Sequence, residues 1–171
     1  MNRLARAGRR SRRSLLFIFL ATCGFLGFLG PAPGTVGAFL GALAYPIVFR
    51  PLSFWFFWPT YGILCLFAVR ICGRAADALQ QTDPPAVILD EFLAMALCYW
   101  PTEHFIGTLP IPIWAFLLLG FGLFRILDIY KPLFIGTLQN LPGGWGIMAD
   151  DLAAAFVTAA LSGATLFFFC H

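Results

Sequence analysis

The chain has 171 residues, of which 60% are hydrophobic and only 11% charged, and its formal net charge is +3. Soluble domains usually carry about 25% charged residues, so this composition, with a mean hydropathy of +0.85, argues against a soluble class and for membrane embedding. The length allows one domain and no more.

The first fourteen residues carry six arginines, and the segment after them is apolar. The arginines are Arg3, Arg6, Arg9, Arg10, Arg12 and Arg13. Next to an apolar stretch such a segment more often fixes a cytoplasmic orientation and contacts anionic lipid headgroups than it binds nucleic acid, so we expect no nucleic-acid partner. A cleaved signal peptide is not favoured, because "ATCG" is a poor cleavage site. We divide the chain into a cytoplasmic tail, 1–14, and a single membrane domain, 15–171.

Apolar runs bounded by proline, glycine and charge predict an all-α membrane bundle. Leu15–Leu29 is short and interrupted by glycine, and we expect it to lie at the interface or to re-enter without crossing. Five further runs are candidate membrane helices: Val36–Phe49, Leu52–Val69, Ala86–Trp100, Ile111–Leu127 and Leu152–Phe169. A polar connection, "GRAADALQQTDPP", separates the second of these runs from the third.

Positive charge orients the five crossings. If the N-terminus is cytoplasmic, the cytoplasmic side receives ten Arg and Lys residues and the outer side receives only Arg50. If Leu15–Leu29 also crossed, Arg70, Arg74, Arg125 and Lys131 would lie outside, against the positive-inside rule. We therefore predict about five crossings, with the N-terminus in the cytoplasm.

This topology brings acidic residues from three distant segments to the cytoplasmic membrane edge. They are Asp90 and Glu91, Asp128, and Asp150 and Asp151. Each site has a structural explanation of its own, because adjacent acids favour a helix N-terminus and Arg125 can pair with Asp128 three residues later. Together, however, the acids form a cluster of the hard oxygen ligands that Mg²⁺ prefers. Arg125 and Lys131 would supply positive charge to a phosphate group.

Two glycine-containing loops adjoin this cluster. In "GPAPGTVGA", Gly34 permits close backbone approach, and we expect Thr35 to cap a helix that starts at Val36 and whose free N–H groups face an anion. Taken alone, this loop is better explained as a capped turn between helices. The loop "PGGWGIM" lets the backbone come near a ligand just before the second acidic pair. The five scattered cysteines predict neither a disulfide framework nor a zinc site, and Glu103 and His104 are assigned no role.

Four blocks of the sequence resemble the signature blocks of the bacterial phosphatidylglycerophosphatase A family. They are "PGTVG", "LDEFLAM", "FRILDIYKP" and "GGWGIMADDLAA", and they occur in the family's order and approximate spacing. The first block departs from the family pattern, because Gly30 stands where the family usually has a proline and Ala38 where it usually has a serine. The six-arginine N-terminus is not part of that pattern.

The resemblance implies an all-helical protein of the bacterial inner membrane that uses Mg²⁺ to hydrolyse phosphatidylglycerophosphate to phosphatidylglycerol and inorganic phosphate, a step of phosphatidylglycerol biosynthesis. The substrate would lie in the inner leaflet, and the active site would face the cytoplasm. The metal-binding and catalytic acids would be Asp90, Glu91, Asp128, Asp150 and Asp151, and the phosphate-binding residues Lys131, Arg125, Gly34 and Thr35. Direct attack by water is favoured because a D-x-D motif is absent, while a carboxylate nucleophile or general base stays open.

Three other classes of membrane protein compete with this interpretation. The main alternative is a non-enzymatic, ion-coupled transporter subunit, which predicts acids spread through the membrane depth. CDP-alcohol phosphotransferases carry a D-G-x-x-A-R…G-x-x-x-D-x-x-x-D pattern, and a second class of lipid phosphatases carries K-x₆-R-P and P-S-G-H elements; neither pattern is present. The sequence assigns no oligomeric state and no separate roles within each acidic pair.

Overall fold

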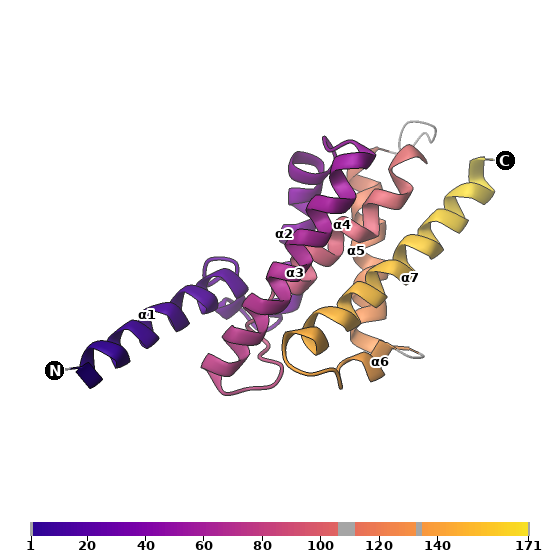
Figure 1. The fold of residues 1–171 in the computed structure, drawn as a ribbon. Coiled ribbons are helices and arrows are strands. Elements are labelled where there is room, and N and C mark those ends of the chain that lie inside the picture. The colour runs from indigo at the N-terminus through magenta and orange to yellow at the C-terminus, as the bar shows by residue number, and fades with distance from the viewer. Residues whose placement is uncertain (1, 106–111, 133–134, 171) are drawn as a thin grey trace.

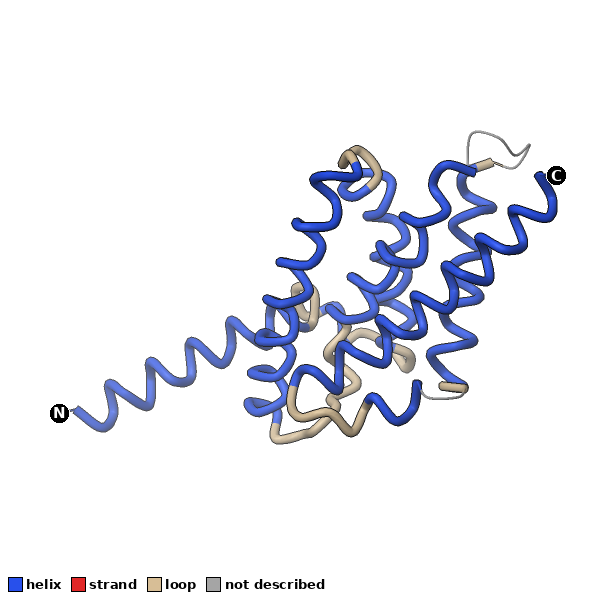
Figure 2. Tube along the Cα trace, turned by 45° about the vertical axis from the view of Figure 1, so that its right-hand side comes forward, coloured by secondary structure: helices blue, strands red, loops and turns tan. Residues whose placement is uncertain are grey.

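Helices make up most of the described part of the chain in a computed structural model. The model describes residues 2–105, 112–132 and 135–170, and it describes their side chains except at 2–11, 104–105 and 168–170. The main helices are α1 (Asn2–Ala21), α2 (Pro33–Ala44), α3 (Phe54–Leu79), α4 (Leu89–Tyr99), α5 (Ile113–Tyr130) and α7 (Gly144–Cys170). The shorter pieces are η1 (Leu26–Phe28), η2 (Tyr45–Phe49), η3 (Trp100–Phe105) and α6 (Ile135–Leu138). No strand occurs in the described ranges (Figure 2), so the all-α prediction is confirmed.

A bundle is formed by α2, α3, α4, α5 and α7, and α1 diverges from one end of it (Figure 1). Helix α4 lies at the centre, because it contacts α2, α3, α5 and α7. Its buried side chains cover most of its circumference and include Leu93, Met95 and Tyr99. The short α6 lies against α7 at the same end as the start of that helix. The first turns of α4 and α7 are thus fixed by packing on several sides.

Small residues let the helices of the bundle approach closely. A Cβ added at Gly37 would lie 2.7 Å from the carbonyl oxygen of Ile88, and one at Gly41 would lie 3.0 Å from Cβ of Met95. Glycines four residues apart on one helix face allow two backbones to pack together, here those of α2 and α4. The start of α7 approaches α3 in the same way, because a Cβ at Gly144 would collide with the carbonyl oxygen of Val69.

The opposite end of the bundle is held by a small polar cluster. The hydroxyl of Tyr45 donates a hydrogen bond to Glu103 over 2.5 Å, and Nε of Arg50 donates another to the same carboxylate over 2.6 Å. These contacts join the end of α2 and η2 to η3. Glu103, to which the sequence assigned no role, therefore ties two segments together far from the starts of α2, α4 and α7.

The five predicted membrane helices correspond to α2 with η2, α3, α4, α5 and α7. Within the described residues, two helices are long and apolar enough to cross a membrane, Ile113–Tyr130 and Gly144–Phe167, and Pro33–Phe49 is a shorter apolar helix. Five crossings are therefore not confirmed. Large apolar side chains such as Ile47, Trp55 and Phe156 are exposed on the bundle surface, a property of faces that contact lipid or another protein.

Helices α1, α2 and α7 begin earlier than hydropathy predicts, and α2 starts at Pro33 rather than at Val36. Helix α1 includes the arginine-rich segment and is continuous across residue 14, so the division into tail and domain does not coincide with a helix end. Helix α7 begins at Gly144 rather than near Leu152, and Asp150 and Asp151 lie beyond its first turn. The suggestion that this pair stabilises a helix N-terminus is therefore wrong, whereas Asp90 and Glu91 do lie in the first turn of α4.

Candidate functional site

The starts of α2, α4 and α7 and the end of α5 meet around one cavity of about 280 Å³, here called the acidic cavity. Its polar and glycine lining consists of Gly34, Asp83, Asp90, Glu91, Arg125, Asp128, Lys131, Asp150 and Asp151. The structure thus brings the three predicted acidic segments to one place. Of the residues proposed from the sequence, Thr35 alone is missing from this lining.

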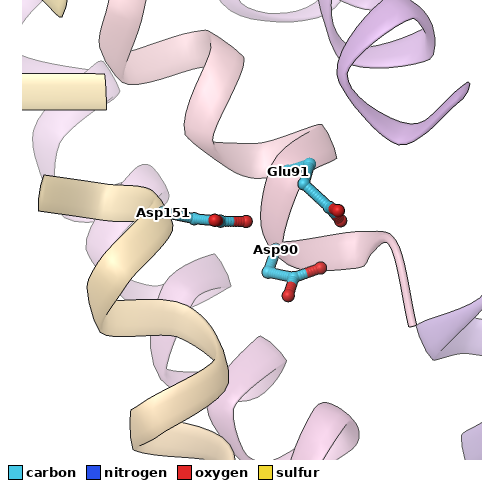
Figure 3. Close-up of side chains that lie close together, drawn as sticks. All are labelled: Asp90, Glu91 and Asp151. Atoms are coloured by element: carbon cyan, nitrogen blue, oxygen red, sulfur yellow. The ribbon is translucent and has the colours of Figure 1, made fainter. Parts of the chain in front are cut away.

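Three carboxylates form the core of the cavity. Asp90 and Glu91 come from the first turn of α4, and Asp151 reaches toward them from α7 (Figure 3). One carboxylate oxygen from each residue lies within 4.8 Å of the other two. Asp90 Oδ1 and Glu91 Oε2 are buried, and neither has a hydrogen-bond partner in the part of the chain that the structure describes. Buried polar atoms are normally paired, so this donor set fits a hard divalent cation.

The two cationic side chains of the cavity each hold a carboxylate. Arg125 Nη1 lies 2.5 Å from Asp128 Oδ2, which confirms the pairing predicted along α5. Lys131 Nζ lies 2.5 Å from Asp150 Oδ2 and joins the end of α5 to α7. Asp90, Glu91 and Asp151 form no ion pair with any described side chain. The cavity therefore has an excess of negative charge that is concentrated on these three residues.

Lys131 is held in position by its backbone as well as by Asp150. It is the C-cap of α5 with a φ of 43°, a left-handed conformation that is uncommon for a residue other than glycine, and Pro132 follows it. Burial acts to lower the pKa of the Lys131 ammonium group. The hydrogen bond that Lys131 donates to Asp150 and the charges of the neighbouring carboxylates outweigh this effect and raise the pKa, so Lys131 is a fixed positive charge.

Asp83 is a residue of the cavity that sequence reasoning missed. It belongs to the polar connection between α3 and α4 and lies at the exposed rim of the cavity. Partial desolvation and the charge of Asp150 raise the pKa of the Asp83 carboxyl, while Lys131 opposes the shift. The available signal was the pair of prolines that follows Asp83 and restricts the chain there.

The start of α2 differs from the sequence-based expectation. The helix begins at Pro33, its N-cap is Ala32, and no side chain caps it, so the capping role expected of Thr35 is wrong. Proline suits the first helical position because its φ is already helical and it lacks the N–H that would be unpaired there. Close backbone approach at Gly34 is confirmed, because a Cβ there would collide with Glu91 Oε1 and lie 3.1 Å from Arg125 Nη1.

Gly34→Ala is expected to weaken binding of a divalent cation by about tenfold, the size of effect seen when the groups that orient metal ligands are disturbed. The added methyl would displace the flexible end of Glu91, one of the three grouped carboxylates, without striking backbone. Titration of the detergent-purified protein with Mn²⁺ or Mg²⁺ measures the change. Gly122→Ala on α5 is the matched control, because a Cβ there meets no atom within 4 Å. Equal losses in both variants, or none in Gly34→Ala, would contradict this prediction.

Comparison with known proteins gives consistent matches over most of the chain. The family model described as Phosphatidylglycerophosphatase A matches residues 19–166. Phosphatidylglycerophosphatase A of Escherichia coli (strain K12) is 32% identical over 160 residues, which cover 89% of this chain and 83% of the relative. The protein of that name from Haemophilus influenzae is 30% identical over 140 residues, or 81% and 82% of the two chains. A protein of Bacteroides thetaiotaomicron named putative phosphatidylinositol-3-phosphatase is 33% identical over 152 residues, or 84% and 89%. No solved structure matches.

Proposed function

This chain belongs to the phosphatidylglycerophosphatase A family, and from that premise we propose that it uses Mg²⁺ to hydrolyse phosphatidylglycerophosphate to phosphatidylglycerol and inorganic phosphate. The observation that carries the proposal is the grouping of Asp90, Glu91 and Asp151 within 4.8 Å, in a cavity that also contains two cationic side chains. The proposed reaction is taken from the names of the relatives. The carboxylate donors support Mg²⁺, which prefers oxygen ligands and leaves coordination positions for substrate phosphate.

Each charged residue of the cavity except Asp83, which lies at its exposed rim, then has a role. Asp90, Glu91 and Asp151 would hold the metal ion, which when bound neutralises phosphoryl oxygens and lowers the pKa of a bound water. Arg125 and Lys131 would bind the phosphate, the first through a planar fork and the second as a point charge.

Asp128 and Asp150 hold these two cations in place through the observed ion pairs. Asp150 Oδ1 is buried and has no hydrogen-bond partner among the described side chains, so it is available to accept a proton from the attacking water or to contact the metal. Gly34 keeps the start of α2 free of a side chain, so that a phosphate can approach the backbone of that turn, where the N–H groups of Thr35 and Val36 already donate to the carbonyl oxygen of Ala32.

The proposal also places the enzyme in the bacterial inner membrane. In it α2, α3, α4, α5 and α7 cross the bilayer, and the acidic cavity lies at the cytoplasmic edge, where it meets the lipid in the inner leaflet. The exposed apolar side chains of the bundle and the predominance of arginine and lysine at the cavity end support this orientation.

Five crossings from a cytoplasmic N-terminus put the C-terminus outside, so reporter fusions at the two ends should give opposite signals.

Phosphate release from phosphatidylglycerophosphate by the purified protein is the direct test. We expect release in Mg²⁺ and none in chelator. Glu91→Gln is expected to lower the rate by about 100-fold or more, as for other losses of electrostatic stabilisation in an active site. Glu103→Gln removes the same charge at the opposite end of the bundle and should leave the rate unchanged. Phosphatidylinositol 3-phosphate should be compared, because one relative is named for that substrate class.

An absence of release above the chelator control would contradict the proposal and favour the transporter alternative. That alternative is not favoured at present, because the family is one of phosphatases. In addition, the acids near the bundle axis gather at one end, whereas a cation pathway would distribute them through the membrane depth.

A further inference from the structure

Two more cavities adjoin the acidic cavity in a row. The next one, of about 540 Å³, shares Asp83 and Ile147 with the acidic cavity. A third, of about 580 Å³, shares Gly73, Asp77 and Gly143 with the second. The row therefore leads from the starts of α4 and α7 to the space between α1 and α3. Two of the three residues shared by the second and third cavities are glycines, which leave that boundary largely free of side chains.

The second cavity, here called the amide cavity, carries mainly neutral hydrogen-bonding side chains. They come from the connections on either side of the site, Gln81 and Thr82 before α4, and Gln139 and Asn140 before α7. Amide and hydroxyl groups both donate and accept hydrogen bonds. The two acids in the lining, Asp77 and Asp83, can accept further hydrogen bonds but repel anions. This combination suits a neutral group rich in hydroxyls and does not suit a phosphate.

The third cavity, here called the arginine groove, combines positive charge with an apolar wall. Arg70 and Arg74 on α3 line it together with apolar side chains from α1 and α3, among them Phe17 and Phe67. Neither arginine forms an ion pair within the described parts of the chain. A guanidinium group beside apolar surface fits a phosphate ester that carries hydrocarbon chains.

We propose that the row binds one phospholipid headgroup along its length. The terminal phosphate lies in the acidic cavity, the glycerol in the amide cavity, and the phosphodiester with the first part of its acyl chains at Arg70 and Arg74. Along the row, the first cavity suits an anion with a metal ion, the second suits hydroxyl groups, and the third suits an anion beside hydrocarbon. The groups of such a lipid follow one another in the same order. The first of these placements rests on the proposed function; the other two stand on the amide cavity and the arginine groove.

The affinity of the protein for the reaction product tests the second and third placements without involving catalysis. Short-chain phosphatidylglycerol keeps the glycerol and the phosphodiester but has no terminal phosphate. Its dissociation constant is measured by calorimetry with detergent-purified protein in chelator, so neither metal nor turnover is involved. Arg70→Gln/Arg74→Gln is expected to weaken binding about tenfold, or about 1.4 kcal/mol. Asn140→Ala is expected to weaken it severalfold through loss of hydrogen bonds to the glycerol.

Control variants make the result specific. Arg12→Gln/Arg13→Gln removes the same charge from an exposed part of α1 outside the three cavities and should leave the affinity unchanged. Arg70→Lys/Arg74→Lys keeps the charge and should retain most of the affinity. Phosphatidic acid of the same chain length has no glycerol spacer, so its binding should not respond to Asn140→Ala. Thermal unfolding establishes that each variant is folded, and Asn140→Ala, in an exposed loop, tests the amide cavity even if the double arginine variant does not fold.

If Arg70→Gln/Arg74→Gln and Arg12→Gln/Arg13→Gln weaken binding of the lipid equally, the proposal is overturned, because the result would indicate a general attraction of anionic lipid to a basic surface. Unchanged binding in Arg70→Gln/Arg74→Gln and in Asn140→Ala would overturn it as well. A protein that shows the expected binding pattern but releases no phosphate would support the headgroup placement and contradict the proposed function. If the protein is an active phosphatase but none of these substitutions changes its affinity for the product, the function is supported and the placement is overturned.

Discussion

Asp151→Asn is expected to abolish phosphate release and, in the absence of metal ions, to stabilise the protein. Asp151, Asp90 and Glu91 place carboxylate oxygens within 4.8 Å of one another, and two unit charges at that distance repel by about 3.5 kcal/mol at an effective dielectric constant of about 20. Sharing of protons relieves part of this repulsion. We therefore expect the asparagine to raise the free energy of unfolding by about 1–2 kcal/mol, while activity falls by about 10²- to 10³-fold.

The two effects are measured on the same preparation. Thermal unfolding in chelator should give a higher midpoint for Asp151→Asn than for the unchanged protein. Adding Mg²⁺ should reverse the order, because an ion that binds only the folded state stabilises it more the more tightly it binds, and the variant has lost one of the carboxylates that would bind the ion. A variant that is less stable in chelator, with no response of the unchanged protein to Mg²⁺, would show that the three acids are held by protons and hydrogen bonds among themselves.

The site could be predicted from the sequence because its residues lie where helices begin and end. Asp90 and Glu91 lie near the start of one apolar run, and Asp128 and Lys131 follow the end of another, so any bundle with this topology brings them to one end. The pairing of Arg125 with Asp128 followed from their spacing on one helix. What the order of the runs does not encode is which acid lies nearest which. The structure separates a group of three acids from two that are held by cations.

Helix boundaries were less predictable, for a physical reason. Hydropathy marks the part of a helix that lies in apolar surroundings, whereas backbone hydrogen bonding continues into polar residues. Helix α7 begins at Gly144, where the absence of a side chain lets its first turn pack against the backbone of α3, a contact with no hydropathy signal. In the same way, Pro33 starts α2 ahead of Thr35. Long-range contacts such as those of Asp83 and Glu103 depend on packing that single-sequence patterns do not contain.

The distribution of charge in the cavity suggests how one site meets two demands. A metal ion needs carboxylates without competing cations, and a phosphate needs cations that are not fully neutralised. Asp128 and Asp150 each pair with a cation through one oxygen, so they orient Arg125 and Lys131 while the group of Asp90, Glu91 and Asp151 stays available. Dividing the acids in this way lets opposite charges share a cavity of about 280 Å³. Substitutions in the Lys131–Asp150 ion pair, like those at Asp151, should therefore change stability and activity to different extents.

Lys131→Met is expected to destabilise the protein by about 3 kcal/mol, the lower end of the range for breaking a buried ion pair. The Asp150 side chain is only 4% exposed, and its second oxygen already has no hydrogen-bond partner among the described residues, so the loss of Lys131 leaves a buried charge uncompensated. The estimate is at the lower end because the Lys131 side chain is 26% exposed and water can replace part of the interaction. Methionine is of similar length and equally strained at the left-handed φ, so the comparison isolates the charge.

The double variant Lys131→Met/Asp150→Asn separates structure from catalysis. Removing both charges should restore most of the stability in chelator, because no buried ion remains unpaired, and the coupling energy between the two sites should be about 1–3 kcal/mol. Phosphate release should stay at least about 100-fold below that of the unchanged protein, because the cation proposed to bind the phosphate and the carboxylate proposed to accept a proton or contact the metal are both gone. Lys131→Arg keeps the charge and should retain stability and part of the activity. A stable double variant with full activity would show that Lys131 serves only to neutralise Asp150, and phosphate binding would then rest on Arg125 and the metal.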